Sequence, residues 1–251
     1  MTETASPAST DASSGLGADR VEVHFEGVKA VDGVSIRLRA GETVGLIGPN
    51  GAGKSTLVNA LTGFERPTSG SVSLDGTDIT AWPPHRVARS GLVRTFQGSR
   101  LFAALTVFEN VKAAVVTGRV STAEARRRTQ AAIDLVGLRD VAERLAGGLS
   151  YGHERRLGVA RAIACEPRYL LLDEPAAGLN EEEGEELVDL IRTVRDLLGC
   201  GVLLIDHDMR VVMSACDRIV VLDYGKVIMT GSPEEVQSSE QVREAYLGSE
   251  A

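Results

Sequence analysis

One short segment, from Gly48 to Ser55, constrains this chain more than any other feature, because it fits the pattern G-x-x-x-x-G-K-[ST]. The preceding run, Thr43–Ile47, is short and apolar, as expected of a strand buried on both faces. The residues that follow favour a helix from about Lys54 to Gly63. A glycine-rich turn between a buried strand and a helix lets backbone N–H groups point inward around phosphate oxygens. This context predicts a phosphate-binding loop in an α/β fold.

The side chains of this loop suggest separate tasks. We expect Lys54 to bridge the β- and γ-phosphates of a nucleotide, Ser55 to bind Mg²⁺, and Thr56 to contact the α-phosphate. The nucleotide-binding residues predicted here are Gly48, Pro49, Asn50, Gly51, Ala52, Gly53, Lys54, Ser55 and Thr56.

A second strand ends in two acids. The apolar run Tyr169–Leu172 leads directly into Asp173 and Glu174. Two carboxylates would be costly to bury without partners, but beside Mg²⁺ they are neutralised. We expect Asp173 to hold the metal, through water, and Glu174 to polarise the attacking water. The alternative is a strand end followed by an exposed acidic turn.

Composition and patterning indicate how the chain is organised. Residues 1–19 are rich in Ser, Thr, Ala and Gly, which predicts a disordered tail before a domain covering 20–251. Helical patterns at Thr106–Gly118, Thr122–Gly137 and Val141–Leu145 predict a helical subdomain at about 98–163, inserted in the α/β core. No apolar run approaches the ~20 residues of a membrane-spanning helix. The net charge of −8 argues against a nucleic-acid partner.

The segment Leu149–Glu154, Leu-Ser-Tyr-Gly-His-Glu, precedes the acidic strand and opens a predicted helix. It resembles the signature of the ATP-binding cassette (ABC) family, usually Leu-Ser-Gly-Gly-Gln, with His153 in place of the glutamine. The resemblance extends over about residues 20–248. It implies a P-loop ABC ATPase fold, in which a mainly parallel sheet with helices on both faces is joined by an antiparallel β subdomain. It also implies that Ser150 and Gly152 close over ATP held by a partner subunit.

The same resemblance implies roles for single residues. Phe25 matches an aromatic that stacks on adenine, and His207 matches a switch histidine that reaches the γ-phosphate. Gln97 matches a glutamine that senses Mg²⁺ and contacts the membrane partner. The implied catalytic residues are thus Glu174, His207 and Gln97. The implied metal-binding residues are Ser55, Gln97 and Asp173, and the implied cofactors are ATP and Mg²⁺.

The sequence around these motifs resembles that of one branch of the family. Arg94–Gln97, Glu174–Asn180 and Asp206–Met209 are similar to the ATP-binding subunits of branched-chain amino-acid importers and of urea and short-chain amide importers. The resemblance implies a second ABC ATPase subunit, two transmembrane permease subunits and, indirectly, an extracytoplasmic solute-binding protein. It implies a cytoplasmic protein, peripheral on the inner face of the cell membrane. Phe102 and Leu105 are candidate apolar contacts with a permease; the alternative is that they belong to the core of the helical subdomain.

Two other functions share the same catalytic residues. One is an exporter ATPase encoded separately from its membrane partner. The other is a non-transport ABC ATPase that acts on nucleic acid or ribosomes. Proteins of that second kind tend to have paired cassettes, coiled-coil arms, zinc-binding cysteines or basic patches, and this sequence has none of these.

Overall fold

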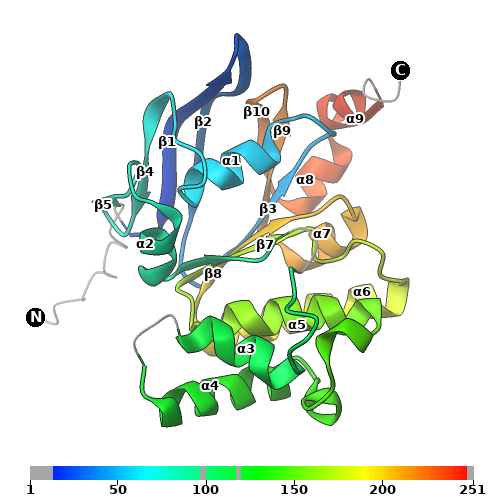
Figure 1. Ribbon diagram of the computed structural model, residues 1–251. Helices are drawn as coiled ribbons and strands as arrows, with labels where there is room; N and C mark the ends of the chain where they lie inside the picture. The colour runs from blue at the N-terminus through cyan, green and yellow to red at the C-terminus, as the bar shows by residue number, and fades with distance from the viewer. Residues whose placement is uncertain (1–13, 97–99, 117–119, 248–251) are drawn as a thin grey trace, which may run out of the picture.

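The computed structural model describes residues 14–96, 100–116 and 120–247, and its strands form two sheets (Figure 1). The smaller sheet is antiparallel, in the order β2 (Val28–Leu38), β1 (Leu16–Phe25), β4 (Ser69–Leu74) and β5 (Thr77–Asp78). The larger sheet has the order β10-β9-β3-β8-β7-β6.

Five strands of the larger sheet run parallel: β9 (Arg218–Asp223), β3 (Thr43–Ile47), β8 (Gly201–Ile205), β7 (Tyr169–Asp173) and β6 (Leu92–Arg94). The edge strand β10 (Lys226–Gly231) pairs antiparallel with β9. Every residue of β3, β7 and β8 is buried. A parallel sheet covered on both faces explains why these strands read as continuous apolar runs.

Each face of the larger sheet packs in its own hydrophobic core. Val44 and Leu46 of β3 pack with the antiparallel sheet and with α1 (Lys54–Leu61). Ile47 lies in the other core, which α6 (Glu181–Leu198) and α7 (Met209–Ala215) share with the helices between β6 and β7. Those helices are α3 (Val107–Val116), α4 (Thr122–Leu135) and α5 (Tyr151–Ile163). In Figure 1, α3 and α4 lie at the end of the molecule away from the antiparallel sheet.

Short helices complete the described chain. They are α2 (Pro84–Arg89), α8 (Pro233–Ser238), α9 (Glu240–Leu247) and the 3₁₀ turns at Arg139–Val141 and Ala146–Gly148. In the described ranges, no helix combines the length and the apolar character that a bilayer crossing demands. The predicted fold class is confirmed: a mainly parallel sheet with helices on both faces and an antiparallel β subdomain.

Two expectations were wrong in detail. The predicted tail to Asp19 is too long, because β1 begins at Leu16, where buried Leu16 pairs with both Leu38 and Leu74. Val141–Leu145 is not a helix beyond one 3₁₀ turn. The carbonyls of Ala142 and Arg144 instead accept hydrogen bonds from the N–H groups at the start of α3. Because these carbonyls accept hydrogen bonds from α3, they do not form the intrahelical hydrogen bonds of a separate helix.

Candidate nucleotide-binding site

The loop between β3 and α1 adopts a backbone that requires glycine at two positions. Gly48 has φ 148° and Gly53 has φ 99°, both in the region that side chains disfavour. A Cβ on Gly48 would lie 2.1 Å from the carbonyl oxygen of Leu222, and one on Gly53 would lie 2.3 Å from that of Ala30. The loop is therefore pressed between β9 and β2.

Lys54 closes this loop on itself. Its ammonium donates to the carbonyl oxygens of Gly48 at 2.5 Å and Pro49 at 2.9 Å. Burial lowers the pKa of Lys54, and the carboxylates of Glu174 and Asp173 oppose that shift. The predicted lysine and the two predicted acids thus share one electrostatic environment. A nucleotide phosphate can take over the contacts that the loop carbonyls supply.

Asp173, at the end of β7, has a partner that the sequence did not reveal. Its Oδ2 atom lies 2.8 Å from Nη2 of Arg94, with both side chains largely buried. Arg94 ends β6, the neighbouring parallel strand. A buried carboxylate without a partner is costly in free energy, so the ion pair with Arg94 explains how Asp173 can be buried.

Glu174 has an unusual backbone. Its φ is 49°, in the left-handed region, and its N–H donates to the carbonyl oxygen of Ile205 at 2.7 Å. A non-glycine residue in this region costs of order 1–3 kcal/mol and persists where its surroundings enforce it. The strand end β8 therefore holds Glu174 in a fixed turn, half-buried beside Asp173.

His207 follows β8 and lies next to a buried acid. Its side chain is 67% exposed, with Nδ1 3.8 Å from Oδ1 of Asp206. Asp206 accepts the backbone N–H groups of His207, Asp208 and Ala176 at 2.8, 3.0 and 2.8 Å. Burial raises the pKa of Asp206, and these hydrogen bonds partly offset the rise. The loops that carry Glu174 and His207 are joined through this carboxyl.

Phe25 lies at the tip of the β1–β2 hairpin, opposite Val28, and is 45% exposed. The same hairpin reaches the phosphate loop through β2, since Asp32 N–H donates to the Gly225 carbonyl and Gly225 N–H donates to the Ala52 carbonyl. An exposed ring on an element bound to the loop is suited to stack on a planar base.

Ser150 and Gly152 stand at the start of α5, where the Ser150 hydroxyl accepts the N–H of His153. Within the described ranges, no hydrogen bond or ion pair joins Leu149–Glu154 to the phosphate loop of the same chain. The ring of Tyr151 instead packs against Gly178, where a Cβ would lie 2.8 Å from it. The signature thus contacts the loop that follows Glu174.

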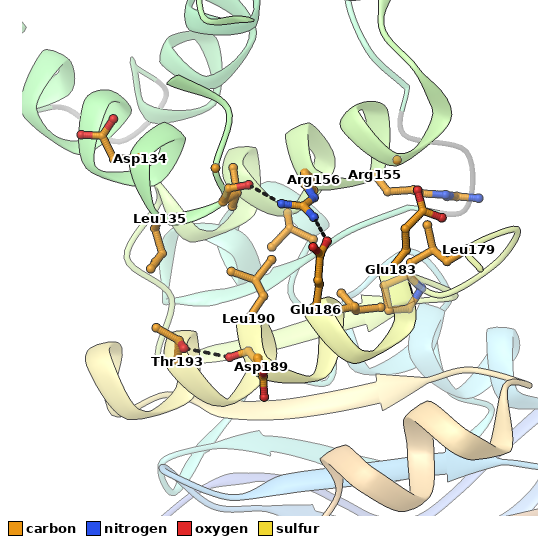
Figure 2. A pocket seen from close by; sticks show the side chains of 16 residues that line it. Asp134, Leu135, Arg155, Arg156, Leu179, Glu183, Glu186, Asp189, Leu190 and Thr193 are labelled. Carbon is orange, nitrogen blue, oxygen red and sulfur yellow. Dashed lines mark hydrogen bonds and ion pairs between the residues drawn. The ribbon is translucent and has the colours of Figure 1, made fainter. Parts of the chain in front are cut away.

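A cavity of about 290 Å³ lies beside the signature, between α5 and α6, and none of its lining residues belongs to the phosphate loop. Figure 2 shows Arg156 of α5 turned toward Glu186 of α6, with which it forms an ion pair. Gly152 and Leu179 line the same cavity. This cavity therefore lies where α4 and α5 meet α6, and it includes no residue of the predicted phosphate loop.

The C-terminal helix α9 reaches the phosphate loop. Burial raises the pKa of the Tyr246 hydroxyl, and the backbone of Gly48 partly offsets that rise. Gln241 and Glu244 of α9 and Asn50 of the loop line one cavity of about 400 Å³. Sequence reasoning missed Tyr246, because no local signal links a terminal helix to a loop two hundred residues earlier.

The remaining predicted residues are placed as follows. Ser55 is exposed at the start of α1, and Thr56 is half-buried one residue later. Phe102 is 51% exposed, whereas Leu105 is only partly so. Gln97 lies outside the described residues. Arg94 and Asp206 are the site residues that sequence reasoning quoted within motifs without assigning them a role.

The oxygen atoms near the loop suit Mg²⁺ better than a transition metal. Across residues 14–96, 100–116 and 120–247, no group of three or more His, Cys, Asp and Glu side chains forms a metal-binding cluster. Mg²⁺ commonly uses one or two protein oxygen atoms together with substrate phosphates and water. The Ser55 hydroxyl and the Asp173 carboxylate are the predicted donors of this kind.

Comparison with known proteins gives a consistent result. The family model described as ABC transporter matches residues 31–177, and one described as branched-chain amino acid ATP-binding cassette transporter matches 226–251. The chain is 43% identical to the high-affinity branched-chain amino acid transport ATP-binding protein BraF of Pseudomonas aeruginosa, over 90% of this chain and 94% of that one. It is 41% identical to LivG of Escherichia coli K12, described by the same words, over 93% and 97%.

Other relatives and structures extend this likeness. The lipopolysaccharide export system ATP-binding protein LptB of Haemophilus influenzae is 36% identical, over 93% of this chain and 97% of that one. An ATP-binding cassette of an ABC transporter in its ADP conformation superposes with a TM-score of 0.83 at 29% identity, covering 93% and 98% of the two chains. The cbiO1 subunit of a Clostridium perfringens ABC transporter complex gives 0.82 at 28%, covering 91% and 92%.

Proposed function

The chain belongs to the ABC transporter family as an ATPase subunit, and we propose that it powers the uptake of branched-chain amino acids or of a related small polar solute such as urea or an amide. The observation that carries this cargo class is the 41–43% identity with BraF and LivG over at least 90% of the chain. The match of residues 226–251 to a model for branched-chain amino-acid cassettes supports it at the C-terminal end.

We propose that ATP binds across the phosphate loop. The Lys54 ammonium exchanges the carbonyls of Gly48 and Pro49 for the β- and γ-phosphates. The backbone N–H groups between Gly48 and Thr56 surround the phosphates, and Phe25 stacks on the base. Ser55 and Asp173 would hold Mg²⁺, which supplies charge neutralisation for the phosphates when bound.

Hydrolysis then depends on two groups held by the end of β8. The Glu174 carboxylate orients a water molecule and takes its proton as the water oxygen attacks the γ-phosphorus and ADP leaves. His207 reaches the γ-phosphate from the adjacent loop. Gln97 is proposed as the residue that reports the state of this site to the membrane partner.

We propose that the second half of each ATP site comes from another subunit. Ser150 and Gly152 lie at a helix N-terminus, which suits a phosphate, and they make no described contact with the phosphate loop of their own chain. A similar but distinct ATPase, or a second copy, would place its signature over this loop. Two permease subunits above the pair and an extracytoplasmic solute-binding protein complete the proposed importer, with this chain on the cytoplasmic face of the membrane and no nucleic-acid partner.

An exporter ATPase is the second candidate, because LptB of Haemophilus influenzae is 36% identical over nearly the whole chain. The deciding experiment is affinity purification of the tagged subunit with its membrane partners, followed by uptake of radiolabelled leucine, urea and acetamide in a deletion strain. We expect the deletion strain to lose uptake of one of these solutes. The wild-type gene should restore that uptake, and the Glu174→Gln variant should not. Co-purification with export components and unchanged uptake would favour the exporter.

A further inference from the structure

Arg94 carries a buried guanidinium that the steps proposed above do not use. Its side chain is 8% exposed and lies at the end of β6, beside the carboxyl end of β7. A buried arginine is retained at a cost in desolvation, so its partners indicate what it does.

The guanidinium contacts the end of β7, α1 with its C-cap Thr62, and the carbonyl of the neighbouring residue, Thr95. Nη2 donates to Oδ2 of Asp173 at 2.8 Å, and Nη1 donates to Oδ1 of Asn59 at 2.7 Å. Nε donates to the carbonyl oxygen of Thr95 at 3.3 Å. Asn59 belongs to α1, the helix that starts with Lys54 and Ser55. Arg94 therefore joins the acid of β7 to the helix of the phosphate loop.

Aromatic rings fix the plane of this guanidinium. Its central carbon lies 4.7 Å from the centre of the Phe96 ring and 5.6 Å from that of Phe64. The two rings meet edge to face at 5.6 Å. A guanidinium held on its faces and at its edges loses little further freedom when it binds a carboxylate.

The orientation of Asp173 follows from these contacts. Its Oδ2 atom is taken by Arg94, and its backbone N–H donates to the Thr95 hydroxyl at 3.0 Å. Oδ1 has no hydrogen-bond partner among the described residues. One oxygen is thus fixed within the core, and the other is left for a ligand.

We propose that Arg94 is a positioning residue for the Mg²⁺ site: it fixes the Asp173 carboxylate through Oδ2, leaves Oδ1 for the metal and its water, and sets the acid relative to Ser55 through Asn59. The inference rests on the proposed nucleotide site. Loss of a group that orients a metal ligand typically weakens metal affinity by about 10–100-fold. We expect that loss in Arg94→Met, with Mg²⁺-independent nucleotide binding unchanged.

The test measures binding and not turnover. A fluorescent, non-hydrolysable ATP analogue is titrated into the full-length protein in EDTA, and then Mg²⁺ is titrated into the saturated complex. Wild type is expected to bind the analogue more tightly with Mg²⁺. Arg94→Met is expected to need about 10–100-fold more Mg²⁺ for half of that enhancement, with the affinity in EDTA as in wild type. Arg94→Lys, which keeps the charge, is expected to lie between them.

Two further variants separate positioning from general stability. Asp173→Asn should lose the same enhancement, and adding Arg94→Met to it should cause no further loss, because the two residues act through one contact. Arg94→Met alone leaves the buried carboxylate of Asp173 without its partner and can therefore unfold. The double variant removes that carboxylate, so it can still be measured in that case. Arg86→Met is the matched control, because Arg86 stacks on Trp82 at 3.8 Å and lies on α2.

The outcomes are distinguishable. A wild type that does not bind the analogue, or that binds it without any effect of Mg²⁺, overturns the proposed nucleotide site. A wild type with a normal Mg²⁺ effect and an Arg94→Met variant with the same half-maximal Mg²⁺ concentration overturns only the role of Arg94. Equal losses in Arg94→Met and Arg86→Met also count against positioning.

Discussion

The carboxylate of Asp206 accepts the backbone N–H of Ala176 at 2.8 Å and thereby joins two loops that carry the proposed hydrolytic residues. Ala176 lies two residues after Glu174, and Asp206 directly precedes His207. The acid is buried, and its other described hydrogen bonds come from backbone N–H groups. Glu174 and His207 are therefore held relative to each other through a buried side chain.

Asp206→Asn tests this arrangement through pH. Burial raises the pKa of Asp206 above 3.8, so the folded protein holds this proton more tightly than the unfolded chain does. The stabilising contribution of the carboxyl is full below pH 3.8 and is lost as the pH rises through the folded-state pKa. We expect the free energy of unfolding of wild type, relative to the variant, to fall with increasing pH across that range in urea titrations.

Asp208→Asn is the control for that experiment, because its shift has the opposite sign. The Arg210 side chain lowers the pKa of Asp208. Wild type should therefore gain stability relative to this variant as the pH rises toward 3.8. Parallel pH dependence of the two variants would contradict the assignment of a buried, destabilised carboxylate to Asp206.

Glu174→Gln should separate binding from hydrolysis. The amide keeps the shape of the side chain and cannot take a proton, so turnover should fall by about 10²–10⁴-fold while ATP binding is retained. The ATP-bound dimer should then accumulate. Phosphate release and size-exclusion chromatography with ATP and Mg²⁺ measure the two effects. Turnover at the wild-type rate would remove Glu174 from its proposed role.

Lys54→Ala should weaken the phosphate loop itself. Hydrogen bonds to charged groups contribute about 1.5–3 kcal/mol, which corresponds to roughly 10–100-fold in affinity for ATP. Isothermal titration with ATP in EDTA isolates this effect from Mg²⁺. Lys112→Ala, on α3, is the matched control and should bind ATP as wild type does. An unchanged dissociation constant in Lys54→Ala would refute the loop assignment.

Gly53→Ala should destabilise the folded protein more than Gly41→Ala. Both glycines have positive φ, 99° and 71°, so both variants incur backbone strain of about 1–2 kcal/mol. Only at Gly53 would the new methyl group meet a carbonyl oxygen, that of Ala30, whereas nothing lies within 4 Å of a Cβ on Gly41. We expect an additional cost of about 1–3 kcal/mol at Gly53, measured by thermal unfolding. Equal losses of stability in the two variants would show that the contact with the Ala30 carbonyl oxygen relaxes without cost.

Local signals made the centre of the fold predictable. The bounds of β3 and the start of α1 follow from an apolar run, a glycine-rich turn and a lysine that lie next to one another in the sequence. The helix Glu181–Leu198 likewise has local signals at both ends, since Asn180 caps its start and Gly199 ends it. Branch-level motifs were sufficient to predict the family.

Features that depend on distant partners escaped prediction. Leu16 is one apolar residue in a polar stretch, and only its pairing with Leu38 and Leu74 makes it part of a strand. The Arg94–Asp173 ion pair joins residues 79 positions apart on neighbouring strands. Such contacts are set by which strands become neighbours, and strand order is not encoded in any local pattern.

The position of Tyr246 has a practical consequence for anyone who handles this protein. The backbone of Gly48, the first residue of the predicted phosphate loop, partly offsets the rise that burial causes in the pKa of Tyr246, and α9 ends one residue later. Changes made to α9 would therefore also alter a cavity that this helix shares with Asn50 of the predicted phosphate loop.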